Sequence, residues 1–256
     1  DRLFSFNYQS IYETRTSRLQ QHNRFIQRHY LRQFNDETIK PRNFDHCGEP
    51  CAIACKKFVG KYKKDYEPYQ ALGPNCGIFD QRAAERLNRY VDSLGMDAIQ
   101  AGGIVSWLME LLFYGVLHPK DFNLPAELPR FKFASSSREF DVIIDSEHNA
   151  AYAKSILDMI LYSEQGAPFR SNIRFAAKWL DEKYKIRSID CAVYNAHGKN
   201  GCMVPNQYWV PGMFSPMPIM GKYFSYYGID YCSPYELGRK NAIRFVYELY
   251  SENSGS

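Results

Sequence analysis

The chain has 256 residues and a formal net charge of +4, with 32 basic and 28 acidic side chains. Hydrophobic residues make up 45% and aromatic residues 16% of it, so it can bury a large core and is unlike a disordered chain. Lys61, Lys63 and Lys64 form a tight basic cluster, and we expect a solvated loop there rather than a nucleic-acid site. The apolar run 104–117 is too short to span a bilayer and carries Glu110.

Apolar residues recur at helical spacing in five segments, and this periodicity predicts a mainly α-helical fold. Two of these helices have clear ends: Asp80 and Asp97 are predicted N-caps, and Gly95 and Gly115 follow the last periodic turns. Pro41 is expected to end the first helix. The predicted helices cover residues 18–34, 80–95, 97–115, 149–162 and 172–184.

Residues 190–231 are rich in Gly, Pro, Met and Tyr and hold neither a helical nor a strand period for long. A segment of this length inside a compact protein is usually a functional loop, and its aromatic content favours an ordered one. Helix resumes at Ser233, a cap followed by proline, and runs to about residue 252. We therefore expect a helical domain over residues 1–185 and the start of a second, with the long irregular loop, over residues 186–256.

Seven cysteines carry the strongest chemical signal. Cys47, Cys51 and Cys55 are spaced four apart, and an odd, crowded set favours a metal site in a reducing compartment, hence the cytoplasm, over a disulfide framework. Three local thiolates and one remote thiolate commonly hold a [4Fe-4S] cluster. A zinc site and buried, unligated cysteines remain alternatives. The isolated cysteines are Cys76, Cys191, Cys202 and Cys232.

The segment 92–97, Asp-Ser-Leu-Gly-Met-Asp, allows two interpretations. In the first, Gly95 ends one helix and Asp97 caps the next, which is a structural role. In the second, the two helix ends form a ligand site, because a left-handed glycine admits a close approach and free amides at a helix start attract an anion. Asp92 and Asp97 would then accept hydrogen bonds from a nitrogen-rich heterocycle and border a polar cavity that Asn75 and Glu67 also reach.

Four motifs follow one another along the chain: residues 47–55 (CGEPCAIAC), 65–67 (DYE), 73–76 (GPNC) and 92–97 (DSLGMD). In order and interval they resemble the aldehyde ferredoxin oxidoreductase family, and the resemblance covers nearly the whole chain. The CGEPC run and the segments 203–209 and 218–223 are similar to the branch that includes glyceraldehyde-3-phosphate ferredoxin oxidoreductase and the tungsten subunit of benzoyl-CoA reductase.

The resemblance implies cofactors and the residues that hold them. Cys47, Cys51 and Cys55 would supply three ligands of a [4Fe-4S] cluster. The 92–97 motif would bind one of two pterins that chelate tungsten or molybdenum, which makes the chain the helical core of a multi-domain enzyme. The residues expected to bind this cofactor are Asn75, Asp92, Gly95, Met96 and Asp97.

The resemblance also places Glu67 beside the metal, and we expect it to be the general base that activates water or the hydrated carbonyl. Repulsion by an anionic centre and partial desolvation would raise its pKa toward neutrality. Tyr66 and Pro68 are expected to keep the local chain extended, with Asp65 and Glu67 on one side. The alternative is an exposed glutamate paired loosely with a neighbouring lysine.

Two further residues have a possible role at the metal. Cys76 follows Glu67 closely and is a candidate metal ligand, since soft thiolates suit tungsten and molybdenum; the alternative is a small buried residue. His197 lies in the long loop that the family places over the substrate, where a neutral imidazole would relay a proton or orient an aldehyde. The alternative for His197 is a surface histidine.

Two departures from the family pattern stand out. The cysteine run is C-x3-C-x3-C, whereas the aldehyde oxidoreductases proper have C-x2-C-x3-C. The second pterin motif, D-x-x-G-L-C, is matched only at its start by residues 252–255, and the chain ends at Ser256, where the fourth cluster cysteine is expected. The family's N-terminal β domain is missing as well. We therefore expect a fragment that holds neither cofactor well on its own.

The expected activity of the parent protein is oxidation of an aldehyde to a carboxylic acid, or the reverse, with electrons passing through the cluster to a ferredoxin-like acceptor. One alternative is the tungsten subunit of a benzoyl-CoA-reductase-like complex, which needs electron-transfer subunits and a thioester substrate. An alternative of another class is a metal-free or zinc-bound helical interaction module. Besides these partners we expect the missing N- and C-terminal parts of the protein, and we expect neither a nucleic-acid partner nor a membrane span.

Overall fold

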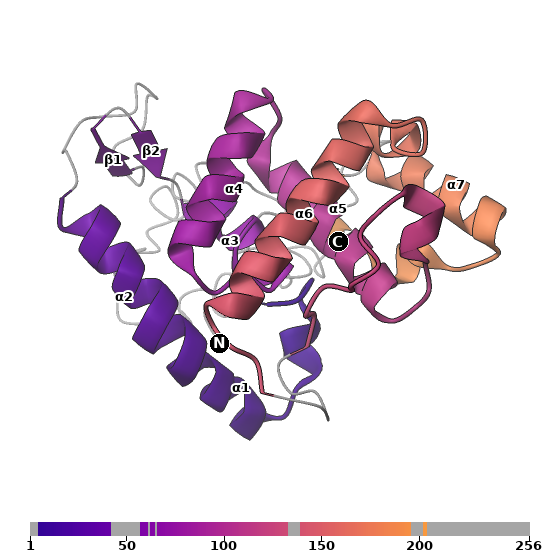
Figure 1. Ribbon diagram of the computed structural model, residues 1–256. Coiled ribbons are helices and arrows are strands. Elements are labelled where there is room, and N and C mark those ends of the chain that lie inside the picture. The colour runs from indigo at the N-terminus through magenta and orange to yellow at the C-terminus, as the bar shows by residue number, and fades with distance from the viewer. Residues whose placement is uncertain are drawn as a thin grey trace, which may run out of the picture. The chain divides into compact units, whose positions relative to one another are not determined.

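The computed structural model describes residues 5–41, 57–60, 62–64, 66–132, 139–195 and 202–203, all of them in the larger of two compact units. This part of the chain is mainly helical, as predicted (Figure 1). Most of the predicted irregular loop and the helix expected from Ser233 lie outside the described residues. The predicted domain boundary at residues 185 and 186 stays a prediction.

The first helical segment is one continuous rod that changes its hydrogen-bond ladder along the way (Figure 1). It begins after Thr14, whose hydroxyl accepts a hydrogen bond from the N–H of Ser17, and it ends at Ile39, just before Pro41. The predicted range of 18–34 was therefore right in type but too short at both ends. Its parts are α1 (Arg15–Gln21), the π-helical η2 (His22–Tyr30), α2 (Leu31–Phe34) and the π-helical η3 (Asn35–Ile39).

Helices α4 (Gln81–Ser93) and α5 (Ala98–Phe113) confirm the capping signals in the sequence. The carboxylate of Asp80 caps α4, and that of Asp97 caps α5 by accepting the N–H of Gln100 at 2.7 Å. Gly95 has a φ of +67°, the left-handed conformation predicted for it, and the two helices meet there at a bend of 117°.

The two remaining long helices are α6 (Ile144–Tyr162) and α7 (Ile173–Tyr184) (Figure 1). Helix α7 has the predicted bounds, with Asn172 as its N-cap. Helix α6 begins earlier than the predicted residue 149. Asp141 explains the earlier start, because its carboxylate accepts the N–H groups of Ile143 and Ile144.

Helix α5 is the centre of the core and contacts α3 (Tyr66–Ala71), α4 and α6. Side chains on every side of it are buried, so it has no solvent-facing stripe over most of its length. Gly102 allows α3 to pack closely, because a Cβ at this position would lie 2.6 Å from Ala71. Phe6 joins the N-terminal segment to this core, with its ring centroid 5.5 Å from those of Phe79 and Phe131.

The remaining elements are short. Strand β1 (Lys57–Val59) pairs antiparallel with β2 (Tyr62–Lys64), and β3 (Tyr194–Asn195) pairs with β4 (Cys202–Met203). The 3-10 turns are η1 (Gln9–Tyr12), η4 (Pro74–Cys76), η5 (Pro119–Phe122), η6 (Ala167–Arg170) and η7 (Ser188–Cys191). Within the described residues no single helix is long and apolar enough to cross a membrane; α4 and α5 reach the threshold only as a sharply bent pair.

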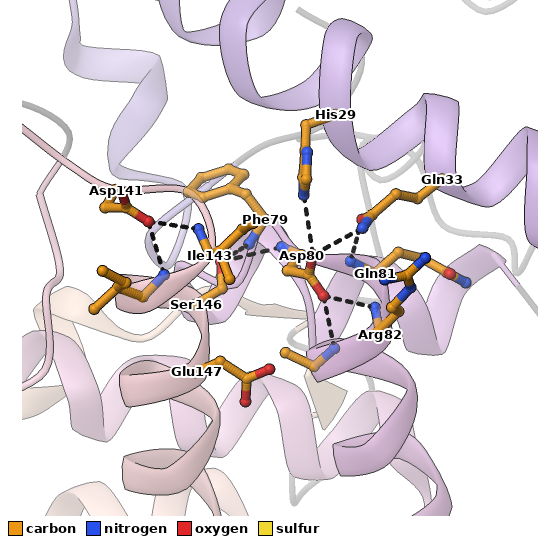
Figure 2. A network of polar contacts seen from close by, with 12 residues as sticks. His29, Gln33, Phe79, Asp80, Gln81, Arg82, Asp141, Ile143, Ser146 and Glu147 are labelled. Atoms are coloured by element: carbon orange, nitrogen blue, oxygen red, sulfur yellow. Dashed lines mark hydrogen bonds and ion pairs between the residues drawn. The ribbon is translucent and has the colours of Figure 1, made fainter.

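Asp80 links α4 to the first helical segment (Figure 2). One of its carboxylate oxygens accepts the N–H groups of Arg82 and Ala83, and the other accepts Nε2 of Gln33 at 2.8 Å and lies 3.0 Å from Nε2 of His29. Burial alone would raise the pKa of Asp80, but the hydrogen bonds from Gln33, His29 and the Ala83 N–H lower it overall. The folded protein therefore favours the ionised form of this carboxyl.

Helix α6 also contacts the segment that precedes α4, through Ser146 (Figure 2). The hydroxyl of Ser146, which is fully buried, accepts the N–H of Phe79 at 2.7 Å and the N–H of Asp80 at 3.0 Å. One short segment before α4 thus receives contacts from α2, η2 and α6. Its backbone donors are satisfied even though they are buried.

The Asp80→Ala variant is expected to lose more stability than a simple cap removal, which typically costs about 0.5–2 kcal/mol. It also leaves Gln33 and His29 without their shared acceptor. The matched control is Asp97→Ala, which removes an exposed cap with one hydrogen bond. Urea unfolding followed by circular dichroism measures both.

The pH dependence gives a second readout for Asp80. Its folded pKa is lowered, so its stabilisation is complete above the ordinary aspartate pKa of about 4 and is lost as the pH falls through the folded value. The loss of stability on acidification should therefore be smaller in Asp80→Ala than in the parent. Equal costs for the two cap variants, with unchanged acid dependence, would contradict this role for Asp80.

Candidate functional site

The predicted site residues divide into two groups. Cys47, Cys51, Cys55 and His197 lie outside the described residues, so the cluster ligands and the loop histidine stay predictions. The structure describes the other predicted residues, which are Glu67, Asn75, Cys76, Asp92, Gly95, Met96 and Asp97.

Glu67 lies in the first turn of α3, where it is half-buried. The expectation of an extended chain here was wrong, because residues 66–71 are helical. Pro68 does not prevent this, since a proline in the first helical turn removes an N–H that has no partner within the helix. The carboxylate of Glu67 therefore stands at a helix start, where the helix dipole favours a negative charge.

Asn75 and Cys76 lie in the tight turn between α3 and α4, and both are buried. The side-chain amide of Asn75 donates to Ser106 Oγ at 3.1 Å, and its carbonyl oxygen accepts the N–H of Tyr8 at 3.1 Å. Gly73 is required at the start of the turn, because a Cβ there would lie 2.1 Å from the carbonyl oxygen of Tyr69. The amide of Asn75 is thus used within the fold itself.

Cys76 has the surroundings of a small core residue, which was the alternative to a metal ligand. Its Sγ is fully buried and donates to the carbonyl oxygen of Ala71 at 3.2 Å, with that of Gly102 at 3.7 Å. Burial raises its pKa far above the ordinary thiol value, so the thiol is protonated. A metal ligand must be a thiolate. Ligation by Cys76 would therefore require a change in this environment.

The junction between α4 and α5 presents its functional groups to solvent. Asp92, Gly95 and Asp97 are all exposed, and nothing lies within 4 Å of the position that a Cβ on Gly95 would occupy. The turn is closed by two backbone hydrogen bonds, from Gly95 to Asp92 at 3.0 Å and from Met96 to Val91 at 3.3 Å. An open left-handed glycine between two exposed carboxylates leaves room for a ligand to approach the backbone.

A pocket of about 540 Å³ lies beside this junction. Helices α5 and α7 both begin at it, since their N-caps Asp97 and Asn172 are lining residues, and helix N-termini favour negative charge. The guanidinium of Arg170, also in the lining, is fixed by the carbonyl oxygens of Ile160 at 2.5 Å and Ser163 at 2.6 Å. The apolar lining residues are Met96, Ala101, Ile104, Ile160, Leu161, Phe169 and Ile173.

This pocket differs in part from the cavity expected from the sequence. Asp97 and Met96 line it, whereas Asp92, Asn75 and Glu67 are not among its lining residues. Gln100 and Ser171 add polar groups that sequence reasoning did not single out. The pocket combines apolar lining residues with a few hydrogen-bonding groups, which suits a heterocyclic ligand.

Lys64 corrects another expectation. It is 4% exposed, so this member of the basic cluster is not solvated. Its Nζ lies 2.6 Å from a carboxylate oxygen of Glu85, which also pairs with Arg89, and the Arg89 guanidinium stacks on the ring of Tyr62. Tyr62 and Lys64 lie two residues apart on β2, hence on the same face of the strand, and both contact α4. These contacts anchor the hairpin between the cysteine motif and Glu67.

Glu110 is the other residue that sequence reasoning missed. It served there only to rule out a membrane span, yet the residue is 3% exposed. Burial raises its pKa to about 7, although hydrogen bonds from Asn7 and Gln9 act in the opposite direction. The sequence did contain a signal for this buried carboxyl group, since Glu110 is a charged residue inside an otherwise apolar helix.

The Glu85→Ala variant should cost about 3–5 kcal/mol, because it leaves the ammonium group of Lys64 buried without its partner. Replacing both partners, as Lys64→Met with Glu85→Leu, should recover most of that loss, since no buried charge remains. Glu182→Ala is the control: its ion pair with Lys178 is exposed and 3.7 Å long, so its loss should cost less than about 1 kcal/mol. Equal midpoints for the two alanine variants in urea would refute the buried-pair argument.

Comparison with known proteins agrees with the motifs. A family model described as aldehyde ferredoxin oxidoreductase, domains 2 and 3, matches residues 6–143. The glyceraldehyde-3-phosphate:ferredoxin oxidoreductase of Pyrococcus furiosus is 31% identical over 97% of this chain and 39% of its own length. An uncharacterised Methanocaldococcus jannaschii protein is 36% identical over 90% of this chain and 38% of its own length. The tungsten-containing aldehyde ferredoxin oxidoreductase of Pyrococcus horikoshii is 36% identical over 34% of this chain and 15% of its own length.

The chain thus spans well under half the length of each of these relatives. The family match covers more than half of the chain and includes α3, the Asn75 turn, and the junction between α4 and α5. These are the elements on which the predicted cofactor residues lie. The chain belongs to the aldehyde ferredoxin oxidoreductase family.

Proposed function

We propose that the parent protein is a tungsten- or molybdenum-pterin oxidoreductase that converts an aldehyde and water into a carboxylic acid, two protons and two electrons. The electrons leave singly through a [4Fe-4S] cluster to a ferredoxin-like acceptor. The observation that carries the proposal is the open α4–α5 junction, which the residues of the predicted pterin motif form and which lies beside a pocket of about 540 Å³. The cytoplasmic location expected from the cysteine pattern is part of the same proposal.

The residues at the junction fit a pterin in their donor and acceptor chemistry. Exposed carboxylates at Asp92 and Asp97 can accept hydrogen bonds from ring and amino N–H groups, and Gly95 leaves space beside the backbone. Apolar side chains of the pocket would cover the ring face, while Arg170 and the start of α7 would face anionic groups. When bound, the pterin-held metal supplies the two-electron redox chemistry.

Glu67 is proposed as the residue that holds the proton removed from water or the hydrated carbonyl. Its place in the first turn of α3 gives it a fixed backbone, and half-burial leaves it accessible to a small substrate. The helix start favours the carboxylate form, which is the form a base needs. His197 is proposed as a second proton carrier. Cys76 is proposed as a metal ligand, although its thiol is buried and protonated in this structure.

Metal content is the first test, on the full-length protein purified without oxygen after growth with tungstate or molybdate. We expect about four iron atoms for each tungsten or molybdenum atom from one cluster, and more if further clusters are present. Zinc alone, or no metal, would overturn the proposal in favour of the interaction module.

Substrate choice then separates the enzyme alternatives. Glyceraldehyde 3-phosphate, simple aldehydes and a benzoyl-CoA-type thioester are each supplied with a viologen dye as electron acceptor or donor. The proposal expects aldehyde-dependent dye reduction. Activity with the thioester alone would instead identify the benzoyl-CoA-reductase-like function.

The Glu67→Gln variant keeps the shape of the side chain and removes the base. In the full-length enzyme we expect kcat/KM for the aldehyde to fall by about 10²–10⁴, with iron and tungsten or molybdenum content unchanged. The control is Glu164→Gln, an exposed residue in the turn after α6 that should behave like the parent. Turnover of Glu67→Gln within about threefold of the parent would end its candidacy and direct attention to His197.

A further inference from the structure

The N-terminal segment contains three consecutive non-glycine residues in the left-handed conformation. Phe6, Asn7 and Tyr8 have φ values of 55°, 49° and 67°. Left-handed backbone is unfavourable for residues with a Cβ, so surrounding contacts must impose it. We call residues 6–8 the left-handed turn.

The N–H groups of the left-handed turn all point at the segment that carries Asn75. Phe6 donates to the carbonyl oxygen of Pro74 at 3.1 Å, and Asn7 donates to that of Asn75 at 2.8 Å. The N–H of Tyr8 donates to the side-chain oxygen of Asn75 at 3.1 Å. Both the backbone and the side chain of Asn75 are therefore placed by the left-handed turn.

The carboxylate of Glu110, on α5, binds side chains within and next to the left-handed turn. Its two carboxylate oxygens accept hydrogen bonds from the side-chain amides of Asn7 and Gln9. The Asn7 amide also donates to the carbonyl oxygen of Cys191 at 2.7 Å, and its oxygen accepts the hydroxyl of Ser106 at 3.3 Å. Ser106 in turn accepts the amide of Asn75, which closes a ring of hydrogen bonds around the turn.

We propose that Glu110 is a positioning residue: as a carboxylate it holds the left-handed turn, and through that turn it places Asn75, one of the predicted cofactor residues. A carboxylate offers acceptors to both amides, whereas a protonated carboxyl replaces one acceptor with a hydrogen that faces a donor. Protonation therefore releases one of the two amides and loosens the turn. The link to catalysis rests on the function proposed above.

Burial explains why Glu110 can change its protonation state near neutrality. The titratable groups that interact with Glu110, directly or through a shared neighbour, are Tyr114 just after α5, Glu13 after η1, and Cys191 and Asp190 on η7. All four are acids, and one of them, Asp190, is paired with the guanidinium of Arg187 at 2.9 Å. Burial raises the pKa of Glu110 to about 7, against the hydrogen bonds from Asn7 and Gln9, which lower it.

Amide hydrogen exchange tests the positioning role on the full-length protein, with rates corrected for the intrinsic effect of pH. In the parent, protection at residues 6–8 should fall by up to about tenfold between pH 8 and pH 6, which spans protonation of a group with a pKa near 7. Glu110→Gln mimics the protonated form, so its protection should be low and independent of pH. Glu164→Gln, with the same chemical change on the surface, should follow the parent.

Gln9→Ala provides an independent variant that keeps Glu110, and it covers the case in which Glu110→Gln does not fold. Gln9 is only partly buried, and its amide is one of the two groups that stabilise the carboxylate. Its removal should raise the pH midpoint of the protection change. A midpoint that stays in place, or pH-dependent protection that persists in Glu110→Gln, would overturn the inference.

The pH profile of kcat/KM separates this role from that of Glu67. If Glu110 positions the site, the parent profile contains an acid limb near pH 7 that Glu110→Gln loses, while the limb due to the base remains. Hydrogen exchange does not require turnover. The predicted exchange pattern in an inactive protein would overturn the proposed function alone, and an active enzyme without that pattern would overturn the role of Glu110 alone.

Discussion

The close packing of α3 on α5 at Gly102 is the constraint on which the rest of the site depends. Because a Cβ at Gly102 would lie 2.6 Å from Ala71, no larger residue allows these backbones to meet in this way. The contact fixes α3, which carries Glu67, against the helix that begins at Asp97. It also buries Cys76 between the carbonyl oxygens of Ala71 and Gly102. The candidate base and the candidate cofactor junction are thus parts of one packed unit.

The sequence predicted what depends on local chemistry. Asp80 and Asp97 cap their helices, and Gly95 takes the left-handed conformation, because each choice is decided within a few residues. The start of α6 was misplaced because Asp141, which initiates it, precedes the apolar period that was used to find the helix. Local signals therefore gave helix type well and helix ends less well.

Residues whose role depends on distant partners could not be predicted in the same way. From the sequence alone Lys64 resembles a surface lysine, because its partner Glu85 is brought to it only by the fold. Glu110 likewise resembles a simple interruption of an apolar helix, because its partner Asn7 lies far away in the sequence. Pro68 suggested an extended chain because its tolerance in a first helical turn depends on where the helix begins. Motif order identified the family, but the pairing of buried charges required three-dimensional packing.

The bend of 117° between α4 and α5 has a consequence for what can bind at Gly95. The carboxyl end of one helix and the amino end of another meet within a few residues, so carbonyl groups with a partial negative charge lie near N–H groups with a partial positive charge. A simple anion would gain at one end of this junction and lose at the other. An amphoteric ring, with proton donors along one edge and acceptors along the next, would match both ends.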